Sequence, residues 1–187
     1  MNLRPKLGSW RRMRGDARGV AAVEFALVIP IVILIYAGGF EVVQAATVYR
    51  KLTDTTVQMA NVTSQYTSVA KSDISSIAGA SSQIMAPYAT SPLTVVMTEV
   101  GTDKNSAATV QWSKGYVNGS LTTGLAQNSS VTMPKNFASA NSYYIMVQTT
   151  YSYTPTIGSA FVHPIPMVNQ IFMVPRQSLQ IPCKDCP

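Results

Sequence analysis

The 187-residue chain has few charged residues and little of the chemistry on which enzymes depend. Only 12% of its residues are charged, about half the share that is usual in soluble domains. Its single histidine, His163, is expected in a loop or an interface, and no two acidic residues are spaced as a general acid–base pair. The motifs of serine hydrolases, P-loop proteins and zinc proteases are absent. We therefore predict no enzyme activity, no catalytic residues, no cofactor-binding residues and no cofactor.

Cysteine is also scarce, because the chain has only two, which stand close together as Cys183-Lys-Asp-Cys186. A structural zinc site needs four ligands, and one cysteine pair with one distant histidine does not supply them. A redox pair of the thioredoxin type would precede a helix, whereas Pro187 follows this one. Cys183 and Cys186 are therefore disulfide candidates, within one chain or between subunits. Reactive or free thiols are the alternative, and no metal is expected.

Basic residues are concentrated near the N-terminus and are sparse elsewhere. Residues 1–19 contain six Arg or Lys and one Asp, a net charge of +5, whereas the rest contains eight basic and seven acidic residues, a net charge of +1. Nucleic-acid binding needs a basic face on a folded domain, so we expect no nucleic-acid partner. The asymmetry instead follows the positive-inside rule, and it predicts a cytoplasmic basic leader over residues 1–19 with the body outside.

A long apolar segment follows and predicts a transmembrane helix over residues 20–43. Between Glu24 and Glu41 lie the 16 uncharged residues of Phe25–Phe40, about 24 Å of helix. The apolar residues on either side extend this to the length of a membrane span and leave both carboxylates toward the interfaces. Pro30 bends such a helix, which membrane helices tolerate.

Glu24 is a costly residue in this segment. A carboxylate at bilayer depth costs roughly 2.5–3.5 kcal/mol on insertion scales, so a functional role is its default interpretation. If the chain is cut between Gly19 and Val20, the new α-amino group lies four residues before Glu24. On a helix this is about 6 Å, so the ammonium and the carboxylate can compensate each other within one chain or between neighbours.

The order of these features resembles the processing site of type IV pilin-like proteins: Gly19, four small apolar residues, Glu24-Phe25 and an apolar helix with Pro30 near its middle. It is similar to that of the TadE-like pseudopilins, or minor pilins, of the tight-adherence (Flp, type IVc) pilus system, over roughly residues 11–60. The resemblance implies cleavage after Gly19 by a prepilin peptidase, which leaves Val20 first. It implies that Glu24 and Phe25 serve subunit assembly, and that the protein takes part in pilus assembly, adhesion and biofilm formation.

The same resemblance implies the partners and the location of the protein. Its partners would be the prepilin peptidase, other pilins and pseudopilins, the assembly platform in the inner membrane, and membrane lipid. It would cross the bacterial inner membrane once, with a cytoplasmic N-terminus and a periplasmic C-terminal domain, or be incorporated in an extracellular pilus. The resemblance does not predict the cysteine pair.

Two other interpretations of the N-terminal region stay open. In the first, the protein is an uncleaved, signal-anchored membrane protein whose extracytoplasmic domain binds a ligand. In the second, the basic and apolar segments are a secretory signal, and a signal peptidase cuts near Ala45, after Val43-Gln44-Ala45. Only processing as a pilin requires both Gly19 and Glu24.

The remaining residues, 44–187, predict an extracytoplasmic α+β domain. An apolar spacing of three and four residues extends the first helix over residues 44–69. Ser72-Asp73, as an N-cap, predicts a second helix over residues 72–86 that Pro87 ends.

A strand-rich region, 93–181, and a cysteine-containing tail, 182–187, complete this domain. Alternating and β-branched runs predict its strands, Asn118-Gly119 predicts a turn, and three prolines predict a loop between Tyr153 and Asn169. The strand candidates are 93–100, 108–112, 143–153 and 171–174.

Overall fold

The structure is a computed structural model, and it describes residues 19–134, 137–157, 159 and 162–186. The chain divides into two compact units, residues 1–43 and 44–187.

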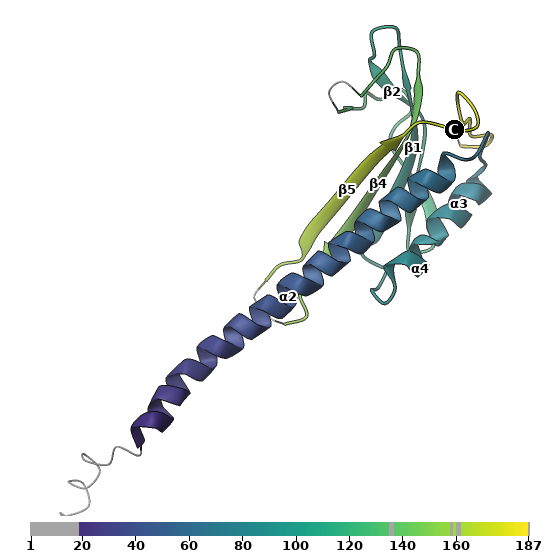
Figure 1. Cartoon of the computed structure of the whole chain (residues 1–187). Coiled ribbons are helices and arrows are strands. Elements are labelled where there is room, and N and C mark those ends of the chain that lie inside the picture. The colour runs from purple at the N-terminus through teal and green to yellow at the C-terminus, as the bar shows by residue number, and fades with distance from the viewer. Residues whose placement is uncertain (1–18, 135–136, 158, 160–161, 187) are drawn as a thin grey trace, which may run out of the picture. The chain divides into compact units, whose positions relative to one another are not determined.

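One long helix, α2 (Val20–Thr63), runs through the boundary between the two units. Residues 20–43 are the helix of the first unit, and residues 44–63 are the first element of the second unit. An antiparallel sheet and two shorter helices complete the second unit (Figure 1). The α+β fold with a long, apolar N-terminal helix, as predicted from the sequence, is confirmed.

The sheet of the second unit has five strands, and all neighbouring strands are antiparallel. Its strand order is β3-β2-β1-β4-β5, so that β1 is central and β3 and β5 are the edges. The three strands from β1 to β3 follow one another as hairpins, and β4 returns to the other side of β1. The strands are β1 (Leu93–Thr102), β2 (Ala108–Val117), β3 (Ser120–Thr123), β4 (Tyr143–Tyr153) and β5 (Ile165–Met173).

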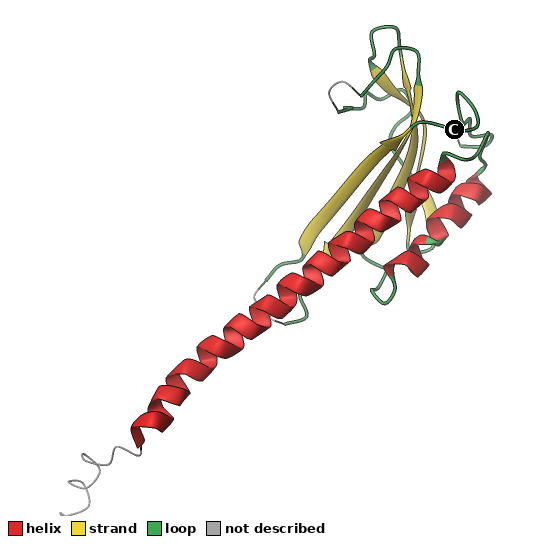
Figure 2. Cartoon of the chain, in the orientation of Figure 1, coloured by secondary structure: helices red, strands yellow, loops and turns green. Residues whose placement is uncertain are grey.

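The helices of this unit lie on one face of the sheet (Figure 2). They are residues 44–63 of α2, then α3 (Lys71–Gly79) and α4 (Ser81–Met85). Alternate residues of each strand face them, and the buried apolar side chains between the two layers form the core of the unit. Each of these large apolar side chains stabilises the fold by about 1.5–3 kcal/mol. The core includes Val48, Leu52, Met59, Ile74, Ile77, Leu93, Val95, Met97, Trp112, Ile145 and Val147.

Hydroxyl groups also join α2 to the sheet within this core. The Oγ1 atoms of Thr56 and Thr149, both fully buried, are 2.6 Å apart. The Thr56 hydroxyl is also 2.7 Å from the Leu52 carbonyl oxygen, to which it donates. At the edge, Asn169 Nδ2 donates to Thr53 Oγ1 at 2.7 Å. The sheet is therefore fixed to α2 by directional contacts as well as by apolar packing.

The helices of the outer unit differ from the sequence prediction at three points. Helix α2 ends at Thr63 rather than near residue 69, because the chain turns there and the Gln65 amide bonds the Val62 carbonyl. The expected second helix, 72–86, is two helices that meet at Ala80. The expected N-cap at Ser72-Asp73 is also wrong, since α3 begins at Lys71 and the Asp73 carboxylate accepts a hydrogen bond from the Ala70 amide at 2.9 Å.

The strand predictions differ most at the C-terminal edge of the sheet. The bounds of β4 are those expected, and Asn118 and Gly119 form the expected turn, both with positive φ. Strand β5, however, begins at Ile165, inside the predicted proline loop, and contains Pro166. An edge strand accepts proline because one side of its backbone pairs with no other strand.

Candidate functional site

The first candidate site is the start of α2, where Gly19 directly precedes the helix. A Cβ added at Gly19 would meet nothing within 4 Å, so this position has open space around it. Glu24 is exposed and stands four residues after Val20, about 6 Å along the helix axis. The structure thus places Gly19 directly before α2, and Val20, Glu24 and Phe25 within the first two turns of this helix.

The apolar side chains that follow Glu24 are exposed in the single chain. Phe25 is 66% exposed, and the large apolar residues of the following turns are exposed as well. The most apolar 18-residue window of α2 has a mean hydropathy of 2.6 and contains no buried residue. A helix that is apolar on all sides is covered by lipid or by other helices, because water would otherwise contact its whole surface. This part of α2 is long and apolar enough to cross a membrane.

Pro30 lies inside this exposed part of α2 and does not end the helix. It lacks the amide that would bond the Ala26 carbonyl, a loss that membrane helices tolerate. Gly38 and Gly39 follow one another further along, and an added Cβ at either would meet nothing within 4 Å. Neighbouring helices can approach closely at such positions.

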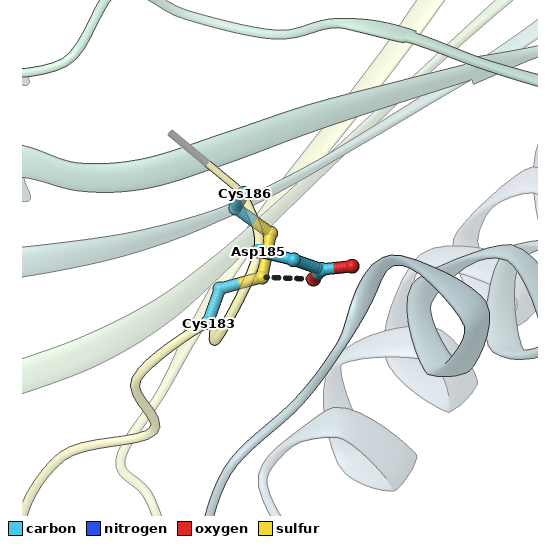
Figure 3. Close-up of side chains that lie close together, drawn as sticks. All are labelled: Cys183, Asp185 and Cys186. Atoms are coloured by element: carbon cyan, nitrogen blue, oxygen red, sulfur yellow. Dashed lines mark hydrogen bonds between the residues drawn. A yellow bond between two sulfur atoms is a disulfide. The ribbon is translucent and has the colours of Figure 1, made fainter.

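The second candidate site is the cysteine pair of the C-terminal segment, which Figure 3 shows in close-up. Cys183 and Cys186 are joined in a disulfide, with their Cα atoms 5.4 Å apart. Asp185 Oδ1 lies 3.6 Å from the Cys183 sulfur. A disulfide sulfur carries no proton and cannot donate a hydrogen bond, so the two atoms are in van der Waals contact only. The pairing leaves a single carboxylate and no thiolate, which is too few ligands for a metal ion.

The disulfide loop is attached to the turn between α2 and α3. The Val69 amide donates to the Pro182 carbonyl at 3.0 Å, and the Lys184 amide donates to the Val69 carbonyl at 3.0 Å. Asp185 Oδ1 accepts a hydrogen bond of 2.8 Å from the Lys71 amide, at the start of α3. The loop thereby holds the C-terminal segment against the helical layer.

Glu99, in β1, is a buried acidic residue whose role the sequence analysis missed. It is 0% exposed, and its Oε1 accepts a hydrogen bond from the Ile181 amide at 2.6 Å. Its Oε2 has no hydrogen-bond partner in the part of the chain that the structure describes. Burial raises the pKa of this carboxyl from 4.5 to about 7, although the hydrogen bond from Ile181 acts in the opposite direction.

Glu99 and Trp112 together hold the C-terminal segment on the sheet. Trp112 lies directly opposite Glu99 on the neighbouring strand β2. Its Nε1 donates a hydrogen bond to the Ile181 carbonyl at 2.8 Å. Both backbone polar groups of Ile181 are therefore bonded to side chains of the sheet. One signal was present in the sequence: Glu99 falls on the face of its strand that Leu93, Val95 and Met97 make apolar.

The described residues do not bring together a catalytic group around His163 or Glu99. His163 is exposed just before β5, as the sequence predicts for a loop residue. Glu99 faces a backbone amide and has no titratable neighbour among its hydrogen-bond partners. The geometry of these sites therefore serves attachment and packing.

In a comparison with known families, residues 19–60 match the model described as TadE-like protein. The resemblance inferred from the sequence is thereby confirmed for the helix α2, and the match does not extend to the sheet. TadE-like proteins are components of the Tad pilus system and not a known enzyme family. No curated protein and no solved structure matches the chain.

Proposed function

We propose that this chain, TadE-like over residues 19–60, is a pseudopilin of a Tad-type pilus that a prepilin peptidase cuts after Gly19. The observation that carries the proposal is the position of Glu24, one helical turn inside an exposed apolar helix that begins directly after Gly19. A helix that served only as an anchor would gain from an apolar residue at this position.

Cleavage would create a charge partner for Glu24. The new α-ammonium group of Val20 would lie about 6 Å from Glu24 along the helix, so neither charge would remain uncompensated in lipid. The same groups can pair between neighbouring subunits and thereby set the register of one helix on the next. The apolar side chains from Phe25 onward then pack first in lipid and later against other pilin helices.

The proposed partners follow from this sequence of events. The prepilin peptidase acts on the leader, the inner-membrane assembly platform receives the mature subunit, and other pilins and pseudopilins pack on α2. The basic leader stays in the cytoplasm and the outer unit, residues 44–187, lies in the periplasm or on the pilus. Adhesion and biofilm formation would then depend on surfaces of the outer unit.

The packing around Ala45 favours this proposal over release by a signal peptidase. Ala45 lies inside α2 and packs against the core of the outer unit. Its neighbour Gln44 accepts a hydrogen bond from the Tyr88 hydroxyl at 3.0 Å. A cut near Ala45 would divide a continuous helix and remove Gln44, which belongs to the outer unit and bonds Tyr88. An uncleaved, signal-anchored protein is the second candidate, and the experiment below separates it from the first.

The test is the intact mass and the N-terminal residue of the full chain recovered from membranes of its host. A chain that begins at Val20 is the expected result. A chain that begins at Met1 would identify an uncleaved anchor, and a soluble chain that begins near Ala46 would identify a secretory signal. We expect Gly19→Trp to block processing, whereas the matched control Gly38→Trp, also at a position with open space around it, is processed normally.

A further inference from the structure

The end of the outer unit at which α2 enters it carries an uncharged surface formed by two connections. One is the segment between α4 and β1, where Tyr88 bonds Gln44, the first residue of the unit. The other is the connection from β4 to β5. Near the end of β4 the Tyr151 hydroxyl donates to the Ala89 carbonyl at 3.1 Å, and Thr154 and Thr156 of the connection line one pocket together with Gln44 and Tyr88. These contacts place both connections beside the residue that directly follows the apolar segment of α2.

Three apolar side chains are exposed here, two in the β4–β5 connection and one at the first residue of β5, which pairs with Tyr153 at the end of β4. Ile157 is 48% exposed, Val162 is 45% exposed and Ile165 is 42% exposed. The sequence has no Asp, Glu, Lys or Arg between residues 136 and 175, and none between residues 86 and 92. The two connections therefore offer apolar groups and a tyrosine and contain no Asp, Glu, Lys or Arg, and His163 is the one histidine among them.

A bilayer is the occupant that this surface fits. Val43, the last residue of the first unit, is bonded directly to Gln44, so a membrane crossed by the apolar segment of α2 stays within reach of this end of the outer unit. Because the outer unit is covalently joined to this segment, the effective concentration of lipid at its surface is always high. Tyrosine is enriched where a membrane meets water, and a surface without charge enters that layer at little cost.

We propose that Tyr88, Ile157, Val162 and Ile165 form a membrane-contact rim that rests in the interfacial layer of the bilayer. The inference rests on α2 crossing a membrane, as in the proposed function, and goes beyond it by assigning lipid contact to the outer unit. The rim fixes the orientation of the outer unit on the bilayer and is released when the subunit leaves the membrane.

The test places a tryptophan in the rim of the full chain. Ile157→Trp is compared with Leu179→Trp in vesicles of phosphatidylcholine that carries bromine on its acyl chains. Leu179 is the matched control because it is 91% exposed and lies in the C-terminal segment, two residues before Ile181, which bonds Glu99. With the signal of the unsubstituted chain subtracted, we expect the tryptophan introduced in the rim to be quenched at least about twofold more strongly than the tryptophan introduced at the control position.

Two further measurements keep the outcomes distinct. Flotation of the vesicles on a density gradient shows whether the chain is inserted, and Val162→Trp provides a second rim position if Ile157→Trp alters thermal unfolding. A chain that floats while rim and control tryptophans are quenched equally overturns the rim alone. A chain that does not float overturns both the membrane span of the proposed function and the rim.

Discussion

Glu99 of β1 accepts a hydrogen bond from the backbone amide of Ile181, although the two residues are 82 positions apart in the sequence. Trp112 binds the carbonyl of the same residue, so that two side chains of the sheet hold one backbone unit of the C-terminal segment. The same segment carries the disulfide that is attached to the turn between α2 and α3. The sheet, the helical layer and the C-terminal segment are therefore connected through a few defined contacts.

The buried carboxyl of Glu99 predicts that the outer unit is less stable at higher pH. The pKa of Glu99 is raised from 4.5 to about 7, so the folded state holds a proton that the unfolded state releases between these values. Stability contributed by the neutral carboxyl is therefore present below pH 4.5 and is lost as the pH rises through 7. We expect the free energy of unfolding to fall by about 3 kcal/mol over this interval. Thermal unfolding of the full chain in detergent at a series of pH values measures it.

Glu99→Gln tests the assignment of this pH dependence. The amide keeps the acceptor oxygen for Ile181 and does not titrate, so the variant should lose most of the slope between pH 5 and pH 8. Asp54→Asn is the matched control, because Asp54 is an exposed carboxylate on α2. An unchanged slope in Glu99→Gln would show that another group is responsible.

The disulfide between Cys183 and Cys186 predicts a modest loss of stability on reduction. It closes a short loop, for which the loss of chain entropy corresponds to about 2 kcal/mol. Reductant should lower the melting temperature of the full chain and speed tryptic cleavage after Lys184, whose amide is bonded to Val69. The double variant Cys183→Ser/Cys186→Ser is the control, and it should melt at the reduced value with or without reductant. Equal cleavage rates before and after reduction would contradict the prediction.

The hydroxyl pair of Thr56 and Thr149 predicts two unequal substitutions. Thr56 donates its proton to the Leu52 carbonyl, so Thr149 is the donor in the contact between the two hydroxyl groups. Thr56→Val leaves the Thr149 proton buried without an acceptor and should cost about 2 kcal/mol, whereas Thr149→Val leaves only an acceptor lone pair unused and should cost about 1 kcal/mol. Thermal or urea unfolding of both variants and of the double variant gives the coupling between them. Equal losses would show that the donor is assigned wrongly.

Local signals made α2 and β4 predictable from the sequence. The start of the helix follows from the change from basic to apolar residues after Gly19, and the alternation of Tyr143–Tyr153 defines β4 to the residue. The Asn118-Gly119 turn follows from the positive φ that these two residues accept. Each of these features depends on residues close together in the chain.

Features that depend on distant residues were not predictable in the same way. Strand β5 includes Pro166 because it pairs along its whole length with β4, and the local sequence does not reveal this pairing. The role of Glu99 depends on Ile181, which reaches it through the fold of the C-terminal segment. The pairing of Cys183 and Cys186 was one of several alternatives, because spacing alone does not choose between a disulfide within the chain and one between subunits.

Glu24 provides the prediction that bears most directly on pilus assembly. Glu24→Ala should still be inserted and cleaved after Gly19, because the apolar segment and the glycine are unchanged. Without the carboxylate, the ammonium group of Val20 has no partner in lipid or at the contact with the next subunit. Recovery of other pilins with the tagged variant should fall about tenfold, which corresponds to the loss of about 1.4 kcal/mol of contact energy.

The controls separate a loss of charge from a loss of packing. Glu24→Asp keeps the negative charge and should retain most of the recovery of other pilins. Val28→Ala shortens an exposed apolar side chain one turn further along α2 and should reduce recovery less than Glu24→Ala does. Normal recovery with Glu24→Ala would refute the charge pair, while a start at Val20 in the same sample would leave the processing step intact. Equal losses in Glu24→Ala and Val28→Ala would instead assign the effect to helix packing alone.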